Sequence, residues 1–543
     1  MKKILRLLFV VTAYATLLIG CGKAVDQTTD VSTNASVAKE LTVGIPNDFG
    51  PINLYTESED WINEMVYDKL MASSPYIEKP IPWLAEKVTK ENDTTWTVVV
   101  RDGIKWQDNQ KFTAEDVKFT YEYYRDGAQN RYTHHVNEVP SIKAIDIAKD
   151  GKTLTFTCEY ACPQLDTITF ADLPILPEHI WKGVENPRKV TELAIGTGPY
   201  KLTEYKAGDH YTLQANTDYF KGEPTVSKIN LPIISDSTAM FNALKTGEID
   251  ISKRTVPTEL ESSLLSSDFK LAKVSALSIV QLGMNFTKEP FADETFRAAL
   301  SNAINQDALV KTVGSGVSGV EGYPHKDSPW TNPTNKQPFD QNAAITAFDK
   351  LGYKDLDGDS FRENQAGKKV TFKLIVASNE PIYVRVAELI KKQLADVGFD
   401  VHVKAEEPTT FAADSNDKNY DLYVSLIGPH GAADPDQFIM SNRSGYLWTK
   451  DLSYPAMDSL QKEWEATSTA EARKAVSFKL QTLYNAQPTA ISLYYPEAVY
   501  AYNAKKYDGY VETLGFGIIN KYSFLSRAVQ KEVSTTTPDL LSK

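Results

Sequence analysis

The stretch Trp96-Thr-Val-Val-Val-Arg-Asp-Gly-Ile-Lys-Trp106, followed by Phe112-Thr-Ala-Glu-Asp-Val-Lys-Phe-Thr-Tyr-Glu122, contains clear signals for local structure. The β-branched run at 96–101 predicts a strand, which ends at the turn residues Asp102-Gly103. Thr113 and Asp116 have the spacing of a capping box, and the acidic side chain lies at the favourable end of the helix dipole. We therefore expect a helix from Val117 to about Tyr124.

Strand and helix patterns alternate on both sides of this stretch. We expect strands at 41–45, 280–286, 370–376 and 400–404, and helices at 237–246, 292–310 and 382–397. In the last helix apolar residues recur at helical spacing until Gly398 ends the pattern. Interleaved strands and helices indicate an α/β fold.

The chain has 543 residues, which is more than one hydrophobic core supports, so two or more domains or lobes are expected. Hydrophobic residues make up 42% and charged residues 24%, which excludes a disordered, collagen-like or polytopic membrane protein. The net charge of −13 argues against nucleic acid as a partner, because that binding needs a basic face.

The first 21 residues have the pattern of an export signal. Lys2, Lys3 and Arg6 precede a 13-residue apolar run, which is too short for a membrane-spanning helix. The following Gly20-Cys21 resembles the bacterial lipoprotein signal, which predicts a signal peptide at 1–20 and lipidation of Cys21. An ordinary signal peptide with a chance cysteine is the alternative. Residues 21–39 read as a flexible tether.

Processing after residue 20 would remove the three basic residues and deepen the net charge from −13 to −16. We expect an extracytoplasmic protein that is lipid-anchored to the bacterial membrane. A Gram-positive surface and a Gram-negative periplasm are both open. Two cysteines would remain, Cys158 and Cys162. A local disulfide suits this compartment, and an unpaired or metal-ligating pair is the alternative.

Several phrases, in order, resemble the extracytoplasmic solute-binding protein family 5, the peptide- and nickel-binding lipoproteins of ABC importers. Besides the opening stretch, they are Gly196-Thr-Gly-Pro-Tyr200, Asn216-Thr-Asp-Tyr-Phe220, Ala239 to Asp250, Arg297 to Asp307, Leu351 to Asp359 and Tyr420-Asp-Leu-Tyr423. The resemblance covers about residues 40 to 525.

The resemblance implies a two-lobed periplasmic-binding-protein-like fold of type II, in the large cluster with an extra subdomain. The implied parts are lobe I at 40–285 with a subdomain at about 76–195, lobe II at 286–490, and a return to lobe I at 491–543. The strands that cross between the lobes would be 281–286 and 492–495. A monomer that captures a ligand between the lobes and delivers it to ABC permease subunits is implied, without catalysis or a cofactor.

In the family that this chain resembles, the loop after the Tyr420 strand, here residues 425–438, faces the ligand. Peptide binders of the family tend to have an Asp, which pairs with the peptide ammonium, at the position of Gly431. Asp434 or Asp436 could substitute for it. Nickel-chelate binders tend to have a His in this loop, and His430 lies there; neutral imidazole suits nickel. A hydrogen bond from His430 to the backbone is the alternative.

Phe49, Asn285 and Tyr383 are the other ligand-binding candidates. The adjacent His134 and His135 cannot easily bind one ion together. We favour a peptide ligand because it is the commoner ligand of the family, with a metal chelate as the alternative. A surface sensor or interaction protein with the same fold also stays open.

The acidic stretch Asp355-Leu-Asp-Gly-Asp-Ser-Phe-Arg-Glu363 suggests a cation site. Its glycine is at position 4 and its position 12 is Ala366, so it does not follow the EF-hand register. Asp355, Asp357 and Asp359 could hold a weakly bound ion, and a solvated turn is the alternative. The dinucleotide-type pattern at 314–319 follows a helical segment rather than a strand, so no enzyme is expected from it.

Overall fold

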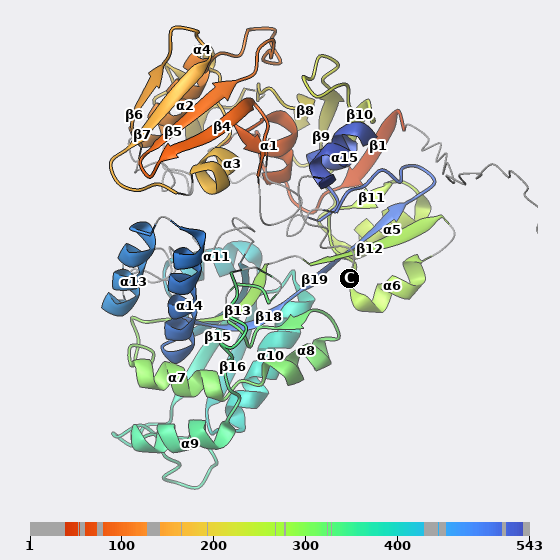
Figure 1. Cartoon of the computed structure of the whole chain (residues 1–543). Coiled ribbons are helices and arrows are strands. Elements are labelled where there is room, and N and C mark those ends of the chain that lie inside the picture. Colours follow the sequence, from red (N-terminus) through yellow and green to blue (C-terminus); the bar gives the residue numbers. More distant parts are fainter. Residues whose placement is uncertain are drawn as a thin grey trace, which may run out of the picture. The chain divides into compact units, whose positions relative to one another are not determined.

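Figure 1 shows a computed structural model of the chain. The structure describes residues 38–535 except 53, 55–59, 73–79, 128–141, 164, 193, 266–267, 276–277, 323, 327, 329, 428–443, 445–451, 468 and 513–516. The chain divides into Met1–Ala35 and Ser36–Lys543, and all of the described residues belong to the second unit. Outside the described residues lie the predicted signal peptide at 1–20, Cys21, most of the tether, His134, His135, His430, Asp434 and Asp436.

The first sheet has seven strands in the order β12-β19-β11-β1-β10-β9-β8. They are β1 (Glu40–Gly44), β8 (Tyr200–Lys206), β9 (His210–Ala215), β10 (Lys228–Pro232), β11 (Ile251–Ser252), β12 (Phe269–Ser275) and β19 (Glu497–Asn503). β1 is parallel to β10 and to β11, and its Leu41 and Val43 are fully buried. The alternating pattern that predicted a strand at 41–45 therefore belongs to an interior strand.

A separate four-stranded sheet has the order β4-β5-β7-β6 and contains the strand predicted at 96–101. Its antiparallel strands are β4 (Ala85–Asn92), β5 (Thr95–Val100), β6 (Ile142–Ile147) and β7 (Thr153–Cys158). Helix α2 (Ala114–Arg125) lies against β6 and β7. The strand and the helix predicted from this stretch are both confirmed.

The predicted capping box at Thr113 and Asp116 is present. Asp116 also accepts a hydrogen bond from the backbone amide of Glu178, at 2.9 Å, and so joins α2 to the start of α4 (Glu178–Trp181). Burial raises the pKa of Asp116 even though these hydrogen bonds oppose the shift. A residue that begins a helix thus also ties together two parts of the subdomain.

The second sheet has six strands in the order β14-β18-β13-β17-β15-β16. They are β13 (Ile279–Met284), β14 (Val317–Ser318), β15 (Thr371–Ala377), β16 (Asp400–Glu406), β17 (Leu422–Ile427) and β18 (Ala490–Tyr495). β15 is parallel to both β16 and β17, and α10 (Pro381–Ala395) packs on these three strands. The predicted strands at 370–376 and 400–404 and the helix at 382–397 are confirmed within two residues.

The predicted single helix at 292–310 is wrong. The segment forms two helices, α7 (Glu294–Asn302) and α8 (Gln306–Val313). Asn305 separates them, because its backbone is extended and its side chain accepts a hydrogen bond from the amide of Ala308 as the cap of α8.

The chain passes between the two large sheets twice. β12 of the first sheet is followed by β13 of the second, and β18 of the second is followed by β19 of the first, with Pro496 alone between them. The second sheet therefore extends from Ile279 to Tyr495, beyond the limits of 286 and 490 predicted for lobe II. The predicted crossing segments 281–286 and 492–495 overlap β13 and β18, which pair with each other inside this sheet.

The remaining elements are short or lie outside the sheets. They are α1 (Asp60–Val66), β2 (Met71–Ala72), β3 (Ile81–Pro82), a π-helix η3 (Leu165–Thr169), α3 (Phe170–Asp172), the 3-10 helix η4 (Pro187–Lys189), α5 (Ser237–Thr246), α6 (Thr258–Leu264), α9 (Gln341–Lys350), α11 (Pro408–Asn416), α13 (Pro455–Glu465), α14 (Ala470–Ala486), the 3-10 helix η5 (Lys521–Phe524) and α15 (Arg527–Thr535). Within the described part of the chain no helix is both long and apolar enough to cross a membrane.

Cys158, at the end of β7, and Cys162 form a disulfide with their Cα atoms 6.4 Å apart. Both residues are buried. The indole of Trp96 donates a hydrogen bond to the carbonyl of Cys162 at 3.0 Å, so the bridge lies against the core of the four-stranded sheet.

Candidate functional site

The carboxyl ends of parallel strands in both large sheets define the candidate site. In the first sheet, β1, β10 and β11 are parallel, so the segments that follow them, 45–50, 233–236 and 253–256, begin at one edge. In the second sheet, Ser378 to Glu380 follow β15. Ligands of open α/β sheets bind outside the carboxyl ends of the strands, which makes these segments the place to look for binding residues.

The loop after β1 is held in place by Asp48. Its carboxylate accepts hydrogen bonds from the hydroxyls of Tyr205, at 3.0 Å, and Tyr211, at 2.9 Å. It also accepts one from the amide of Gly208 at 2.6 Å. Partial burial acts to raise the pKa of Asp48, but these hydrogen bonds outweigh it and hold the pKa below its ordinary value. The loop is therefore pinned to the hairpin of β8 and β9.

Phe49 is positioned by Tyr211, the same tyrosine that donates a hydrogen bond to Asp48. Its amide donates to the hydroxyl of Tyr211 at 2.8 Å, and the two ring centroids are 6.5 Å apart. The side chain is half-buried and packs on the core of the first lobe. Phe49 thus lies at the strand-end edge, and its contact with a ligand stays a prediction.

Arg254 and Glu380 form an ion pair between the strand ends of the two sheets. Arg254 follows β11, and its Nη1 lies 3.5 Å from the Oε1 of Glu380, which precedes α10. Nη2 of Arg254 donates to the carbonyl of Ser235 at 3.2 Å, in the segment after β10. Among the described residues, the buried Nε of Arg254 has no hydrogen-bond partner. The guanidinium therefore has one buried donor that no described group uses.

Two opposing effects act on the charge of Glu380, and burial is the larger one. Burial raises the pKa of its carboxyl group, and the positive charge of Arg254 opposes that shift. Its side chain retains 38% exposure, so the carboxylate is still accessible. Sequence patterns single out neither Arg254 nor Glu380, because the two residues are 126 positions apart and no local motif marks them.

Tyr383 lies one turn further along α10. It is half-buried and packs against the core of the second lobe. Burial raises the pKa of its hydroxyl group, with Tyr494 and Glu380 adding to the shift. The phenol is neutral over the physiological range, so it can offer a hydrogen bond at this edge. Its role as a ligand contact stays a prediction.

The position of Asn285 contradicts the expectation that it contacts the ligand. It is 1% exposed, and its amide nitrogen donates to the carbonyls of Lys418 and Tyr420 at 3.0 and 2.8 Å. Its side-chain oxygen accepts from the amide and the hydroxyl of Thr287. All of its hydrogen-bonding capacity is used within the second lobe, so Asn285 fixes the segment before β17 instead.

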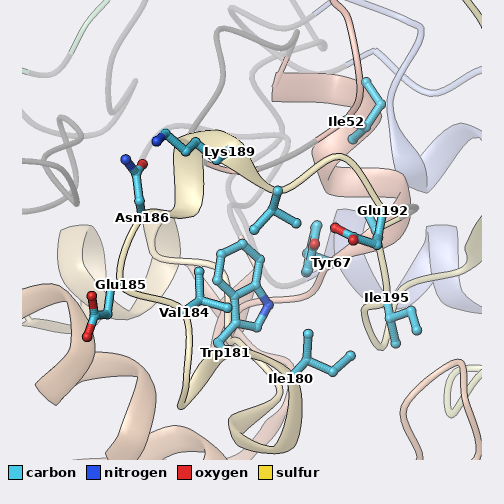
Figure 2. A pocket seen from close by; sticks show the side chains of 12 residues that line it. Ile52, Tyr67, Ile180, Trp181, Val184, Glu185, Asn186, Lys189, Glu192 and Ile195 are labelled. Carbon is cyan, nitrogen blue, oxygen red and sulfur yellow. The ribbon is translucent and has the colours of Figure 1, made fainter.

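A cavity of about 480 Å³ lies within the first lobe. Figure 2 shows the indole of Trp181 in its lining, with Ile52 and Ile195 on one side and Asn186 and Lys189 on the other. The lining also includes Tyr67, Ile180, Val184, Glu185, Val190, Glu192 and Ala194. It is mostly apolar with a few charged groups, which is the usual character of a small-molecule pocket.

Residues 79–450 match the family described as bacterial extracellular solute-binding proteins, family 5 Middle. The protein belongs to this family. This match confirms the family membership predicted from the ordered sequence phrases. Members of the family are extracellular binding proteins. The family is defined by solute binding and not by catalysis.

Relatives of this family-5 protein include binders of two ligand types. It is 26% identical over 481 residues to the oligopeptide-binding protein AppA of Bacillus subtilis (strain 168), covering 84% of this chain and 85% of AppA. It is also 26% identical over 430 residues to the nickel-binding periplasmic protein of Escherichia coli (strain K12), covering 76% and 79% of the two chains.

The fold of the family-5 protein is similar to that of NikZ from Campylobacter jejuni, solved in complex with Ni(L-His). The TM-score is 0.78 at 21% identity, and the superposition covers 88% of this chain and 98% of NikZ. This likeness, together with the family match, confirms the predicted fold class, a two-lobed α/β fold like that of the periplasmic binding proteins.

Proposed function

We propose that this family-5 protein is the solute receptor of an ABC importer and that it captures a peptide between its lobes for delivery to the permease. The observation that supports this most directly is the meeting of Arg254 and Glu380 at the strand ends of both sheets. A peptide is a zwitterion, and this pair offers a carboxylate for its ammonium and a guanidinium for its carboxylate.

Glu380 supplies what the loop after β17 lacks. The family's peptide binders tend to have a carboxylate where this chain has Gly431. Glu380 is an accessible carboxylate on the second lobe, and Tyr383, in the first turn of the helix that follows it, adds a polar aromatic surface. In this proposal Phe49 contacts the peptide from the first lobe.

The test is identification of the ligand. The purified protein is analysed by mass spectrometry for co-purified molecules, and its melting temperature is measured with a mixed peptide library and with nickel plus histidine. A bound peptide at a hundredfold excess over Kd would stabilise the folded state by about 2.7 kcal/mol. Stabilisation by peptides supports the proposal, and an effect of the nickel chelate alone would overturn it.

A nickel chelate is the second candidate, favoured by the relatives that bind nickel and by His430. If it is correct, His430→Ala abolishes stabilisation by nickel plus histidine. His402→Ala is a matched control, because His402 lies on β16 with 69% of its side chain exposed. Equal stabilisation of both variants would exclude His430 as a ligand.

We also propose that Cys21 is lipidated and anchors the protein to the bacterial membrane. The basic start, the short apolar run and Gly20-Cys21 support it. In cells fed a radiolabelled fatty acid, the wild type becomes labelled and the Cys21→Ala variant does not. Labelling of the variant would argue for a different anchor.

A further inference from the structure

The acidic stretch that begins at Asp355 forms a closed turn. The amide of Lys354 donates to the carbonyl of Glu363 at 3.1 Å, and the amide of Glu363 donates back at 2.8 Å. Within the turn, Gly358 and Ser360 have φ angles of 84° and 74°. The chain thus folds back so that Glu363 lies beside the acidic residues that precede it in sequence.

Three carboxylates converge in this turn. One oxygen each from Asp355, Asp357 and Glu363 lie within 4.8 Å of one another. Both oxygens of Asp355 accept hydrogen bonds from backbone amides of the turn, at 2.7 and 3.1 Å, which fixes the direction of that side chain. Three negative charges this close repel one another, and a cation between them would offset that repulsion.

Glu363 provides the independent sign of a ligand. The residue is only 4% exposed, and its Oε2 accepts from the amide of Leu356 at 2.6 Å. Its Oε1 is buried, and no described residue donates a hydrogen bond to it. Burial of a carboxylate oxygen without a hydrogen-bond donor costs free energy. A bound cation would offset that cost at Oε1, where the described chain supplies no partner.

Two of the cations nearby, Arg362 and Lys369, bind other groups. The guanidinium of Arg362 binds the carbonyl of Val397 and the carboxylate of Asp349, both at 2.6 Å. The ammonium of Lys369 lies 3.1 Å from Asp359 and 3.6 Å from Asp400. Asp359, which the sequence pattern grouped with Asp355 and Asp357, is therefore paired with a lysine.

We propose that Asp355, Asp357 and Glu363 bind a calcium ion. Calcium takes six to eight oxygen ligands, and oxygens on opposite sides of the ion are about 4.6–5.2 Å apart, which the observed spread matches. The two aspartates are exposed, so water can complete the coordination. Extracellular calcium modules have Kd values of about 10⁻⁴ to 10⁻³ M, which we expect here.

The test is calorimetric titration of EDTA-treated, dialysed protein with calcium chloride and, separately, with magnesium chloride, together with melting curves in each salt. We expect one calcium per chain, a higher melting temperature in calcium and a weaker response to magnesium. Glu363→Gln should lose binding by tenfold or more. Because that variant removes no hydrogen bond to Oε1, its melting temperature without calcium should be no lower than that of the wild type.

Two variants serve as controls. Asp359→Asn should retain calcium binding within about threefold, because Lys369 already occupies that carboxylate. Glu388→Gln, an exposed glutamate on α10, should behave as the wild type. The proposal is overturned if the wild type shows no calcium-dependent heat or melting shift, or if Glu363→Gln binds calcium as tightly as the wild type does.

Discussion

At the scale of single residues, Asp68 and Lys521 form a buried charge pair across 453 residues of sequence. They are 0% and 2% exposed at the side chain, and their charged atoms are 3.4 Å apart. Asp68 also accepts hydrogen bonds from the indole of Trp83 at 2.8 Å and the hydroxyl of Tyr219 at 3.1 Å. This cluster joins the segment that follows α1 to the 3-10 helix η5, which lies far along the chain.

We predict that Lys521→Met lowers the free energy of unfolding by about 3 kcal/mol, because it leaves a buried carboxylate without its counter-charge. The double variant Asp68→Asn with Lys521→Met should recover more than half of that loss. Urea unfolding measures both. Lys392→Met, which breaks an exposed pair with Asp396, should cost less than about 0.5 kcal/mol. A similar cost for both lysines would show that the buried pair has no special role.

At the scale of elements, the loop after β1 depends on the hairpin of β8 and β9. Asp48 connects them through Tyr205, Tyr211 and Gly208. Its pKa in the folded protein is lowered from 3.8 by these hydrogen bonds, against the effect of partial burial. Stability from this group is therefore present above about pH 3.8 and is lost as the pH falls through the lower, folded-state pKa.

We predict that Asp48→Asn lowers the melting temperature at pH 6 and that the difference from the wild type shrinks as the pH is lowered below about 4. Scanning calorimetry between pH 6 and pH 3 measures this. Asp218→Asn, an exposed residue on the same lobe, is the matched control and should show a small difference at every pH. A difference that grows on acidification would contradict the sign of the pKa shift.

At the scale of the whole molecule, the candidate site needs both sheets. Arg254 follows a strand of the first, and Glu380 follows a strand of the second. The connections that make this possible are the passages from β12 to β13 and from β18 to β19. Each lobe supplies one member of the charged pair, so neither contains the site alone.

If a peptide ammonium binds Glu380, we predict that Glu380→Gln weakens peptide binding at neutral pH by about 10- to 100-fold, the worth of a hydrogen bond to a charged group. The pKa of Glu380 is raised above 4.5, mainly by burial. Wild-type affinity should therefore fall as the pH is lowered from neutral toward 4.5, while the variant's affinity changes little. Calorimetry over this pH range measures this, with Glu388→Gln as control. Parallel pH profiles would remove Glu380 from the site.

Local sequence patterns predicted much of the fold. The strand at 96–101, the capped helix that follows it and the helix at 237–246 depend on neighbours a few residues away, so their signals are visible in sequence. Family membership followed from the ordered phrases. The predicted helix at 292–310 is wrong because apolar periodicity continues across Asn305, whereas the asparagine side chain caps a new helix there.

The candidate site was less predictable, because its residues meet only after folding. Asn285 looked available, but its partners Lys418 and Tyr420 lie more than 130 residues away and bury it. Arg254 and Glu380 carry no motif at all. The acidic stretch indicated a cation site with Asp359 as a ligand. In the folded chain Lys369 pairs with Asp359, and the closed turn places Glu363 beside Asp355 and Asp357 instead.

Sequence alone determined which elements form and which family they build, since those depend on local periodicity and order. Tertiary structure decided which polar groups are satisfied internally and which are left to bind something else.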